Sequence, residues 1–362
     1  MKTLPSGSVI GILGGGQLGR MTALAAAELG YVCHIFCAQA DEPALDVAAD
    51  QTIASFDDEA ALERFALSVD VVTLEWENVP LSALEIVGRH VSVFPRDAVL
   101  RVAQDRWLEK SFVRTADLGT ADFEIVRSPE KLATFMELFK FPLILKSNRM
   151  GYDGKGQVLI TEGMSAQEAW SQMGSEEGVV EAFVDFACEI SVIVARREDG
   201  EMAAFPPVQN VHQNHILSKT IAPAPIDADV AREAEELARI LAEKLDVVGL
   251  LAVEMFVLKK ANEQGQRVLV NEIAPRPHNS GHWTMDACAC SQYEQLVRVI
   301  CGLPLGDPTP HSRAEMHNLL GQDVARATEL MAQPSACVHL YGKQEVREGR
   351  KMGHVTFLKE EW

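Results

Sequence analysis

An apolar run, a glycine loop and an alanine-rich helical segment follow one another at the start of the chain, and this succession restricts the fold more than any other feature. Residues 9–13 predict a buried strand, and Gly14, Gly16 and Gly19 follow it with the spacing G-x-G-x-x-G. Residues 17–29 then place apolar side chains at helical intervals. A strand that passes into a helix through so short a turn predicts a βαβ unit and therefore a parallel sheet.

The same alternation of strands and helices continues to about residue 105. Three further apolar strands are predicted between helical segments, over residues 31–37, 70–74 and 91–94. We therefore expect a parallel-sheet α/β domain over residues 1–105.

Beyond residue 105 the predicted strands follow one another with short connections, which favours hairpins and an α+β domain. These strands cover residues 141–146, 157–160, 179–184 and 189–196. Residues 230–245 carry one apolar stripe and predict a helix, and residues 285–301 predict another. Residues 303–362 predict a small β-rich module.

The charge balance excludes some classes of partner. The chain has 33 basic and 52 acidic residues, a formal net charge of -19. A nucleic-acid-binding protein usually has a basic footprint, and an anionic membrane attracts basic segments, so neither partner is expected. Seven cysteines without a CxxC pair predict neither a disulfide framework nor a zinc site, and they fit a reducing cytoplasm. We predict no signal peptide and no membrane-spanning segment.

The first glycine loop allows two kinds of ligand and one interpretation without a ligand. A dinucleotide needs an acidic residue at the end of the second strand, but residues 35–38 are Ile-Phe-Cys-Ala and Asp41 comes too late. The backbone N–H groups that precede a helix still form an anion site, which suits a substrate phosphate. A tight turn without a ligand is the remaining alternative.

Lys146 ends an apolar strand, a position that is costly for a cation unless it meets an anion. Residues 151–157, here named the flap, follow with three glycines and Lys155. Such a flexible glycine-rich loop can close over a triphosphate without side-chain clashes. We therefore predict that Lys146 and the flap bind phosphate, and a hairpin tip without a ligand is the alternative.

Two carboxylates are predicted to oppose each other across a hairpin. Glu254 interrupts one apolar strand and Glu272 ends the next, and both are equally far from a turn at residue 263. Opposed like charges destabilise a sheet, and burial of a carboxylate costs more still, unless a divalent cation lies between them. Oxygen ligands of this kind predict a Mg²⁺ site at Glu254 and Glu272, with Asn271 adjacent. Two acids on unpaired strand ends are the alternative.

Three other polar segments are candidates for substrate binding. Glu75 follows the third predicted strand, where ligands of open α/β sheets bind. Arg276 lies in a dense polar loop before a helix, and its planar guanidinium suits a carboxylate. A basic cluster near the C-terminus stands out in so acidic a chain and is predicted to bind phosphate or carboxyphosphate: Lys343, Arg347, Arg350 and Lys351. A solvated loop acid is the alternative for Glu75, and a solvated hairpin turn is the alternative for the basic cluster.

Four motifs in this order resemble the 5-(carboxyamino)imidazole ribonucleotide synthase family of ATP-grasp ligases, and the resemblance covers nearly the whole chain. The motifs are G-G-G-Q-L-G-R at residues 14–20, G-Y-D-G-K-G-Q at residues 151–157, N-E-I-A-P-R and H-N-S-G-H-W at residues 271–276 and 278–283, and G-R-K-M-G-H at residues 349–354. Each motif alone is weak, but all four in order are specific.

The resemblance implies an α/β plus α+β protein with the ATP-grasp fold. It implies a Rossmann-like domain at residues 1–105, an ATP-grasp domain at residues 106–302 and a C-terminal β-rich module at residues 303–362, with residues 115–185 as a mobile lid. The implied reaction is carboxylation of 5-aminoimidazole ribonucleotide with ATP and bicarbonate, through carboxyphosphate, in purine biosynthesis. ATP and Mg²⁺ are the implied cofactors, and members of the family are usually homodimers.

The resemblance also implies roles for individual residues. The ATP-binding positions are Arg106, Lys146, Gly151, Tyr152, Asp153, Gly154, Lys155, Gly156, Gln157, Glu181, Ala182, Phe183, Val184, Glu189, His212, Asn271 and Glu272. The metal carboxylates are Glu254 and Glu272. The substrate-binding positions are Gly16, Gln17, Leu18, Glu75, Tyr152, Arg276, His278, Asn279, Ser280, Lys343, Arg350 and Lys351. The catalytic positions are Asp153, Lys155, Arg276, His278 and Lys351, with Asp153 as the base for the amine.

The chain departs from the family next to the flap. Many members have Arg where Asn148 stands and Gly where Met150 stands, which bears on lid movement and local charge. Three rival functions remain open from the sequence: an ATP-grasp enzyme that joins formate or an amino acid to a ribotide, a dinucleotide-dependent oxidoreductase, and a nucleotide sensor without catalytic activity.

Overall fold

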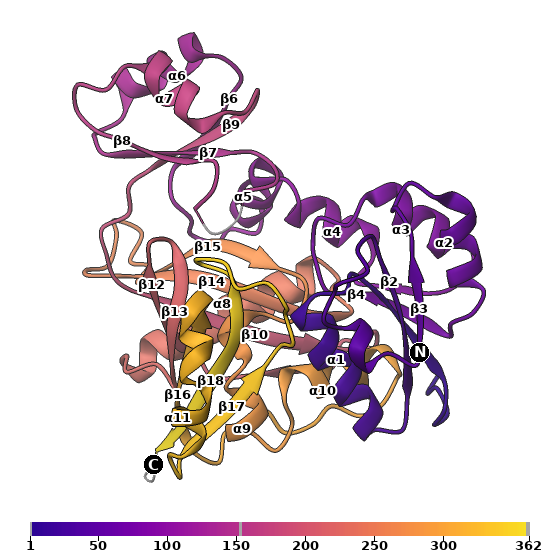
Figure 1. Cartoon of the computed structure of the whole chain (residues 1–362). Coiled ribbons are helices and arrows are strands. Elements are labelled where there is room, and N and C mark those ends of the chain that lie inside the picture. Colours follow the sequence, from indigo (N-terminus) through magenta and orange to yellow (C-terminus); the bar gives the residue numbers. More distant parts are fainter. Residues whose placement is uncertain (1, 152–153, 360–362) are drawn as a thin grey trace.

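A parallel sheet forms the N-terminal part of the protein, which we describe from a computed structural model over residues 2–151 and 154–359 (Figure 1). The strand order is β3-β2-β1-β4-β5, and every neighbouring pair is parallel, as the alternation of strands and helices predicts. The strands are β1 (Val9–Leu13), β2 (Val32–Cys37), β3 (Asp50–Ile53), β4 (Val71–Leu74) and β5 (Val93–Phe94).

Helices cover this sheet, and the sequence did not indicate one of its strands. The helices are α1 (Gln17–Glu28), η1 (Leu45–Val47), α2 (Glu59–Ala66), α3 (Leu81–Gly88) and α4 (Asp97–Ala103). The missed strand is β3, which lies at the edge of the sheet and has no buried residue. An edge strand of this kind has no apolar run or alternation to reveal it.

A small antiparallel sheet with the order β6-β9-β7-β8 stands apart from the parallel sheet, at the top of Figure 1. Two helices pack on it around a core of their own that includes Leu132, Leu145 and Ala169. We name this unit the small sheet; its elements are β6 (Phe123–Val126), α6 (Pro129–Leu138), β7 (Leu143–Ser147), β8 (Gln157–Ile160), α7 (Ala166–Met173) and β9 (Gly178–Ala182).

The largest sheet has nine strands and lies below the small sheet and to the left of the parallel sheet in Figure 1. Its order is β15-β14-β10-β12-β13-β16-β18-β17, with β11 beside β10. Because β16 pairs with β13, the β-rich C-terminal segment continues this sheet. The strands are β10 (Phe186–Arg196), β11 (Met202–Ala204), β12 (Val208–Gln213), β13 (Ile216–Ala222), β14 (Gly249–Leu258), β15 (Val268–Ala274), β16 (Arg313–Leu320), β17 (Ala336–Leu340) and β18 (Lys351–Lys359).

Helices on this sheet bury its apolar faces. The apolar stripe of α8, which includes Val230, Ala234 and Leu241, packs on strands β10 and β14. The helix predicted over residues 285–301 is wrong, because the chain breaks it into α9 and α10, and Ser291 caps the start of α10 by accepting a hydrogen bond from the N–H of Glu294 at 3.1 Å. The remaining helices are α5 (Arg106–Thr115), α8 (Ala228–Lys244), η2 (Asn279–Gly281), α9 (Thr284–Ala287), α10 (Gln292–Ile300), η3 (Gly321–Arg326) and α11 (Ala327–Met331).

The β14–β15 hairpin contains a bulge that decides which side chains face each other. Near the turn Val257 pairs with Val268, a register that alone would place Glu254 opposite Asn271. An extra residue in β15 shifts the register, so that Glu254 pairs with Glu272, as predicted. The opposition of the two carboxylates is therefore confirmed, and the bulge at Asn271 produces it.

Among the described residues, no helix has both the length and the apolar character needed to cross a membrane.

Candidate active site

A cavity of about 670 Å³ opens where the three sheets meet, and it gathers most of the residues that the sequence singled out. Its lining comes from the first residues of α1, the end of β4, the flap, and strands of both antiparallel sheets. The predicted site residues that line it are Gln17, Leu18, Glu75, Arg106, Lys146, Gly151, Gly154, Lys155, Gln157, Glu181, Ala182, Phe183, Val184, Glu189, His212, Glu254, Asn271, Glu272, Arg276, His278, Asn279 and Lys351.

Six predicted site residues do not line this cavity: Gly16, Gly156, Ser280, Lys343, Arg347 and Arg350. Two more, Tyr152 and Asp153, lie outside the described residues.

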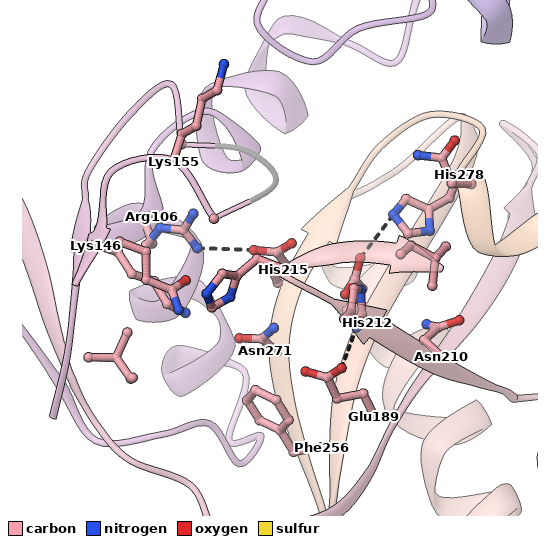
Figure 2. A pocket seen from close by; sticks show the side chains of 18 of the residues that line it. Arg106, Lys146, Lys155, Glu189, Asn210, His212, His215, Phe256, Asn271 and His278 are labelled. Atoms are coloured by element: carbon pink, nitrogen blue, oxygen red, sulfur yellow. Dashed lines mark hydrogen bonds and ion pairs between the residues drawn. The ribbon is translucent and has the colours of Figure 1, made fainter. Parts of the chain in front are cut away.

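The opposed carboxylates each have a cationic or imidazole partner. Oε1 of Glu254 lies 3.0 Å from Nε2 of His278, and Oε2 of Glu272 lies 3.2 Å from a guanidinium nitrogen of Arg106 (Figure 2). Burial alone would raise the pKa of Glu272, but Arg106 and Lys146 overcome it and lower that pKa. The Glu272 carboxylate is therefore held in its charged form.

The bulge brings a third oxygen to the carboxylate pair. Asn271 and Glu272 are consecutive, yet both line the cavity. Oδ1 of Asn271 is buried and has no hydrogen-bond partner. A buried polar atom without a partner is costly, so it indicates a missing ligand. Two carboxylates and an amide oxygen are the donor types that suit Mg²⁺, so the residues fit this ion.

Two buried lysines share one carboxylate at the wall formed by the small sheet. Nζ of Lys146 lies 3.0 Å from Oε2 of Glu181, and Nζ of Lys110 lies 3.2 Å from the same oxygen. Burial would raise the pKa of Glu181, but the two lysines and Arg106 hold it at about 2. A role for Lys110 was not predicted from the sequence, because Lys110 lies on a helix with no motif around it.

One wall of the cavity is apolar and suits a planar base. Ile144, Phe183, Leu217 and Phe256 line it, and Phe256 stacks on the ring of Phe186 with 4.7 Å between centroids. The sequence predicts a binding role for Phe183 but not for the other side chains. These are scattered over separate strands and lie close together only in the folded chain.

Beside the apolar wall, the carboxylate of Glu189 accepts a hydrogen bond from the ring of His212 (Figure 2). Burial lowers the pKa of His212, but Glu189 outweighs burial and raises it. The pair therefore offers the cavity a polar edge next to the apolar wall.

Two flap glycines are required by close contacts. Gly154 has φ +78°, and a Cβ there would lie 2.6 Å from Cβ of His215 on the β12–β13 turn. Gly156 has φ +70°, and a Cβ there would lie 2.4 Å from Oγ of Ser147. Gly156 therefore shapes the flap without lining the cavity. Lys155 is exposed, and its side chain points away from Lys146 and Arg106 in Figure 2.

The two positions that depart from the family have different surroundings. Asn148 is buried, and its side chain accepts a hydrogen bond from the N–H of Trp107 at 3.0 Å and donates one to Glu177 at 2.6 Å. Asn148 thereby joins the start of α5 to the small sheet. Met150 is 61% exposed and has φ +60°, a left-handed conformation that favours glycine.

Arg276 already has an anionic partner within the chain. Its guanidinium forms a bidentate pair with Glu77, in which one of the two contacts measures 2.8 Å. Burial would raise the pKa of Glu77, but Arg276 outweighs burial and lowers it. Glu77, which also lines the cavity, therefore fixes and orients the guanidinium of Arg276 at the cavity wall.

Glu75 fills the anion site of the first glycine loop. Its carboxylate accepts hydrogen bonds from the N–H of Gly16 at 2.9 Å and from the N–H of Gly19 at 3.2 Å. The prediction that these N–H groups receive a substrate phosphate is therefore wrong for this conformation, since an internal carboxylate occupies them. Burial raises the pKa of Glu75, and the two backbone hydrogen bonds oppose that rise.

Lys343 and Arg350 lie near the same glycine loop, on the β17–β18 connection. Both stand close enough to Glu42 to lower the pKa of that carboxyl, although its burial raises the pKa overall. Burial and the neighbouring Arg350 lower the pKa of Lys343 to about 8. The C-terminal basic cluster therefore meets the N-terminal domain at one end of the cavity, where Lys351 is part of the lining.

The assignment of Ser280 to substrate binding is corrected by its burial. Ser280 is 0% exposed, and its hydroxyl lies 2.7 Å from Oγ of Ser191 and 2.8 Å from Nδ1 of His278. Its contact with Nδ1 leaves Nε2 of His278 to face Glu254. Ser280 therefore orients the His278 ring, an effect that adjacency in the motif did not reveal.

A histidine-rich cluster lies outside the cavity. His339 contacts both oxygens of Asp286 at 3.0 and 3.1 Å, and the rings of His339 and His354 stack with centroids 4.6 Å apart and planes 20° apart. Nearly parallel imidazole planes cannot both contain one metal ion, as in-plane coordination by each ring requires. The cluster therefore does not form a metal site in this arrangement.

Comparison with protein families identifies the three parts of the chain. Residues 8–104 match the ribonucleotide synthetase preATP-grasp domain, residues 111–293 match the ATP-grasp domain, and residues 314–362 match the phosphoribosylaminoimidazole carboxylase C-terminal domain. Fold and cavity thus define an ATP-grasp enzyme, and the dinucleotide-dependent alternative has no support.

Relatives narrow the class to one family. The chain is 44% identical to the N5-carboxyaminoimidazole ribonucleotide synthase of Brucella melitensis, over 99% of this chain and 98% of that protein. It is 47% identical to the bifunctional purine synthesis protein purC/E of Dictyostelium discoideum, over 98% of this chain but only 37% of that longer protein. The chain therefore belongs to the N5-carboxyaminoimidazole ribonucleotide synthase family.

Solved structures agree with this membership. An ADP complex of an N5-carboxyaminoimidazole ribonucleotide synthetase superimposes with a TM-score of 0.92 at 39% identity and covers 100% of this chain and 95% of that chain. The Aspergillus clavatus synthase in complex with ADP and 5-aminoimidazole ribonucleotide superimposes with a TM-score of 0.90 at 31% identity, covering 98% of this chain and 94% of that chain.

Proposed function

We propose that the protein carboxylates 5-aminoimidazole ribonucleotide, with ATP and bicarbonate, to give 5-(carboxyamino)imidazole ribonucleotide, ADP and phosphate. The observation that carries the proposal is one cavity that joins an apolar wall, buried cations and an opposed carboxylate pair. Its family membership supports the same reaction, as do relatives named for it and a solved neighbour that holds both ADP and the ribonucleotide.

The nucleotide would lie between the small sheet and the largest sheet. The apolar side chains Ile144 and Phe256 suit the adenine ring, and the Glu189–His212 pair beside them suits hydroxyl groups of the ribose. Lys146 and Arg106 bring positive charge to the phosphates, where charge spreads over the transferring group.

A magnesium ion would be held by the two carboxylates of the β14–β15 hairpin. Glu254 and Glu272 supply charged oxygens, and the unpaired Oδ1 of Asn271 supports a further oxygen ligand at the bulge. When bound, the ion would neutralise phosphate charge that develops during transfer. Arg106 and His278 orient the two carboxylates by the contacts described above, and Arg106 also favours the charged form of Glu272.

The carboxylation chemistry would take place where the γ-phosphate of ATP meets the ribonucleotide end of the cavity. An oxygen of bicarbonate attacks the γ-phosphorus of ATP, the bond to ADP breaks, and carboxyphosphate forms. The exocyclic amine of the ribonucleotide then forms the N–C bond, phosphate leaves with its oxygen, and the amine loses a proton. Arg276, Asn279 and Lys351 line this end and would bind the anions.

Residues near the two glycine loops would complete the ribonucleotide site. Lys343 and Arg350 would neutralise its phosphate from the β17–β18 connection, and Glu75 would face its polar groups from the end of β4, beside the first glycine loop. We keep Asp153, which lies outside the described residues, as the proposed base for the amine.

Closure of residues 115–185 over ATP would protect the reaction, because carboxyphosphate and the carbamate product react with water. Gly154 of the flap lies close to His215 on the β12–β13 turn, so this turn would support the flap when the lid closes. We also propose a cytoplasmic setting, supported by seven free cysteines, five of them buried. A homodimer stays a prediction from the family resemblance.

The reaction itself is tested by ADP release from purified protein with ATP, magnesium and bicarbonate, with and without aminoimidazole ribonucleotide. We expect the ribonucleotide to stimulate release and an acid-labile carboxylated product to form in equal amount. ADP release that does not respond to the ribonucleotide would still support an ATP-dependent ligase, but it would exclude the ribonucleotide as the acceptor. A folded protein that binds ADP without turnover would instead fit a nucleotide sensor.

Replacement of the proposed phosphate and metal ligands should slow turnover strongly. We expect Lys146→Ala and Glu272→Ala each to lower turnover by about a hundredfold or more, because each removes charge stabilisation from the transferring phosphoryl group. Lys244→Ala is the matched control, since Lys244 is exposed at the end of α8. Near-normal turnover of either site variant would contradict the role proposed for that residue.

The lowered pKa of Lys343 predicts a pH dependence of ribonucleotide binding. Lys343 loses its positive charge as the pH rises through about 8. The KM for the ribonucleotide should therefore rise between about pH 7 and pH 9.5, while the KM for ATP stays nearly constant. Lys343→Arg keeps the charge over this range and should flatten the profile. An unchanged profile in Lys343→Arg would exclude Lys343 as its cause.

A further inference from the structure

Lys110 is a buried cation next to the cavity to which no role has yet been given. It lies on α5, its side chain is 1% exposed, and it is not part of the cavity lining. Its Nζ contacts Oε2 of Glu181 at 3.2 Å, the carbonyl oxygen of Asn271 at 3.3 Å and Oγ1 of Thr120 at 3.5 Å. A lysine is almost never buried so deeply unless it is paired, and here the pairing carboxylate is shared with Lys146.

The contacts of Lys110 join three parts of the molecule. Glu181 lies on β9 of the small sheet, Asn271 lies at the bulge of β15, and Lys110 itself lies on the helix between them. One ammonium group therefore ties the wall that carries Lys146 to the strand that carries Glu272. The distance between the proposed phosphate cation and the proposed metal ligand depends on this tie.

The charges of this group matter as much as its geometry. Lys110 and Lys146 contact the same oxygen of Glu181, and Oε1 of Glu181 is buried without a hydrogen-bond partner. Two ammonium groups and one carboxylate leave one surplus positive charge, and only Lys146 of the two lysines reaches the cavity. Without Lys110, Glu181 would pair with Lys146 alone and neutralise it.

We propose that Lys110 is a positioning residue for the nucleotide, because it occupies Glu181 and leaves the positive charge of Lys146 to the phosphates of ATP. The inference rests on the proposed function for the identity of the nucleotide. It differs from a purely structural role in one respect: removal of the Glu181 charge should compensate for removal of the Lys110 charge.

A double-mutant cycle measures this compensation. In Lys110→Met the three side chains have no surplus charge, and in the double variant Lys110→Met/Glu181→Gln the single surplus charge on Lys146 returns. We expect Lys110→Met to raise the KM for ATP and the Kd for ADP about tenfold or more, since it weakens a charge-assisted contact. The double variant should recover at least half of that loss on a logarithmic scale.

Two further readouts separate this role from damage to the fold. The KM for the ribonucleotide should change less than about threefold in Lys110→Met, because its proposed site lies at the other end of the cavity. Lys244→Met, a change at an exposed lysine on α8, should leave all constants unchanged. If Lys110→Met does not fold, the Kd for ADP of the double variant tests the proposal by itself. This Kd should lie within about tenfold of the wild-type value.

The outcomes distinguish this inference from the proposed function. The role of Lys110 would be overturned if the Kd for ADP is unchanged in Lys110→Met, or if the double variant binds ADP no better than Lys110→Met. If Lys110→Met does not fold, the role would be overturned by a double variant that binds ADP more than about tenfold weaker than the wild type. ADP binding by calorimetry needs neither bicarbonate nor ribonucleotide. The cycle therefore keeps its meaning even if the wild-type protein fails to carboxylate the ribonucleotide.

Discussion

Two carboxylates that face each other across the β14–β15 hairpin set the electrostatic terms for the rest of the cavity. Glu254 and Glu272 are directly paired, a destabilising arrangement for like charges on one face of a sheet. Arg106 contacts one carboxylate and His278 contacts the other, and both partners come from outside the hairpin. The N-terminal end of α5 and the loop after β15 therefore lie next to the two carboxylates. A divalent cation would compensate their remaining negative charge.

The cations of the site are held in place by anions that line the same cavity. Glu77 orients Arg276, Glu181 binds both Lys146 and Lys110, and Glu272 binds Arg106. This arrangement explains how a chain with a net charge of -19 can bind polyanionic substrates. The acidic residues paired with these cations lower the free-energy cost of burying the cations. The cations direct their remaining positive charge toward the cavity.

Much of this architecture could be predicted from the sequence, because its signals are local. The parallel sheet followed from alternating apolar runs, and the facing of Glu254 and Glu272 followed from their spacing about one turn. The edge strand β3 has no buried residue, so it left no apolar pattern. The break between α9 and α10 depends on a side-chain cap at Ser291, which competes with an otherwise helical pattern.

The parts of the site that sequence reasoning missed depend on contacts between distant segments. Lys110 has no motif around it, and its role emerges only where α5 meets β9 and β15. Glu75 was expected to face substrate, and its occupation of the glycine-loop N–H groups depends on the pairing of β1 with β4. Ser280 lies within a functional motif but faces the interior, since adjacency in sequence does not fix side-chain direction.

The measurement that tests the central claim most directly is the transfer of oxygen from labelled bicarbonate to phosphate. If the cavity activates bicarbonate by phosphoryl transfer from ATP, ¹⁸O-labelled bicarbonate should deliver one labelled oxygen to each phosphate released, in step with formation of the carboxylated ribonucleotide. Turnover that releases unlabelled phosphate would contradict the account, because it would mean that water, and not bicarbonate, attacks the γ-phosphorus.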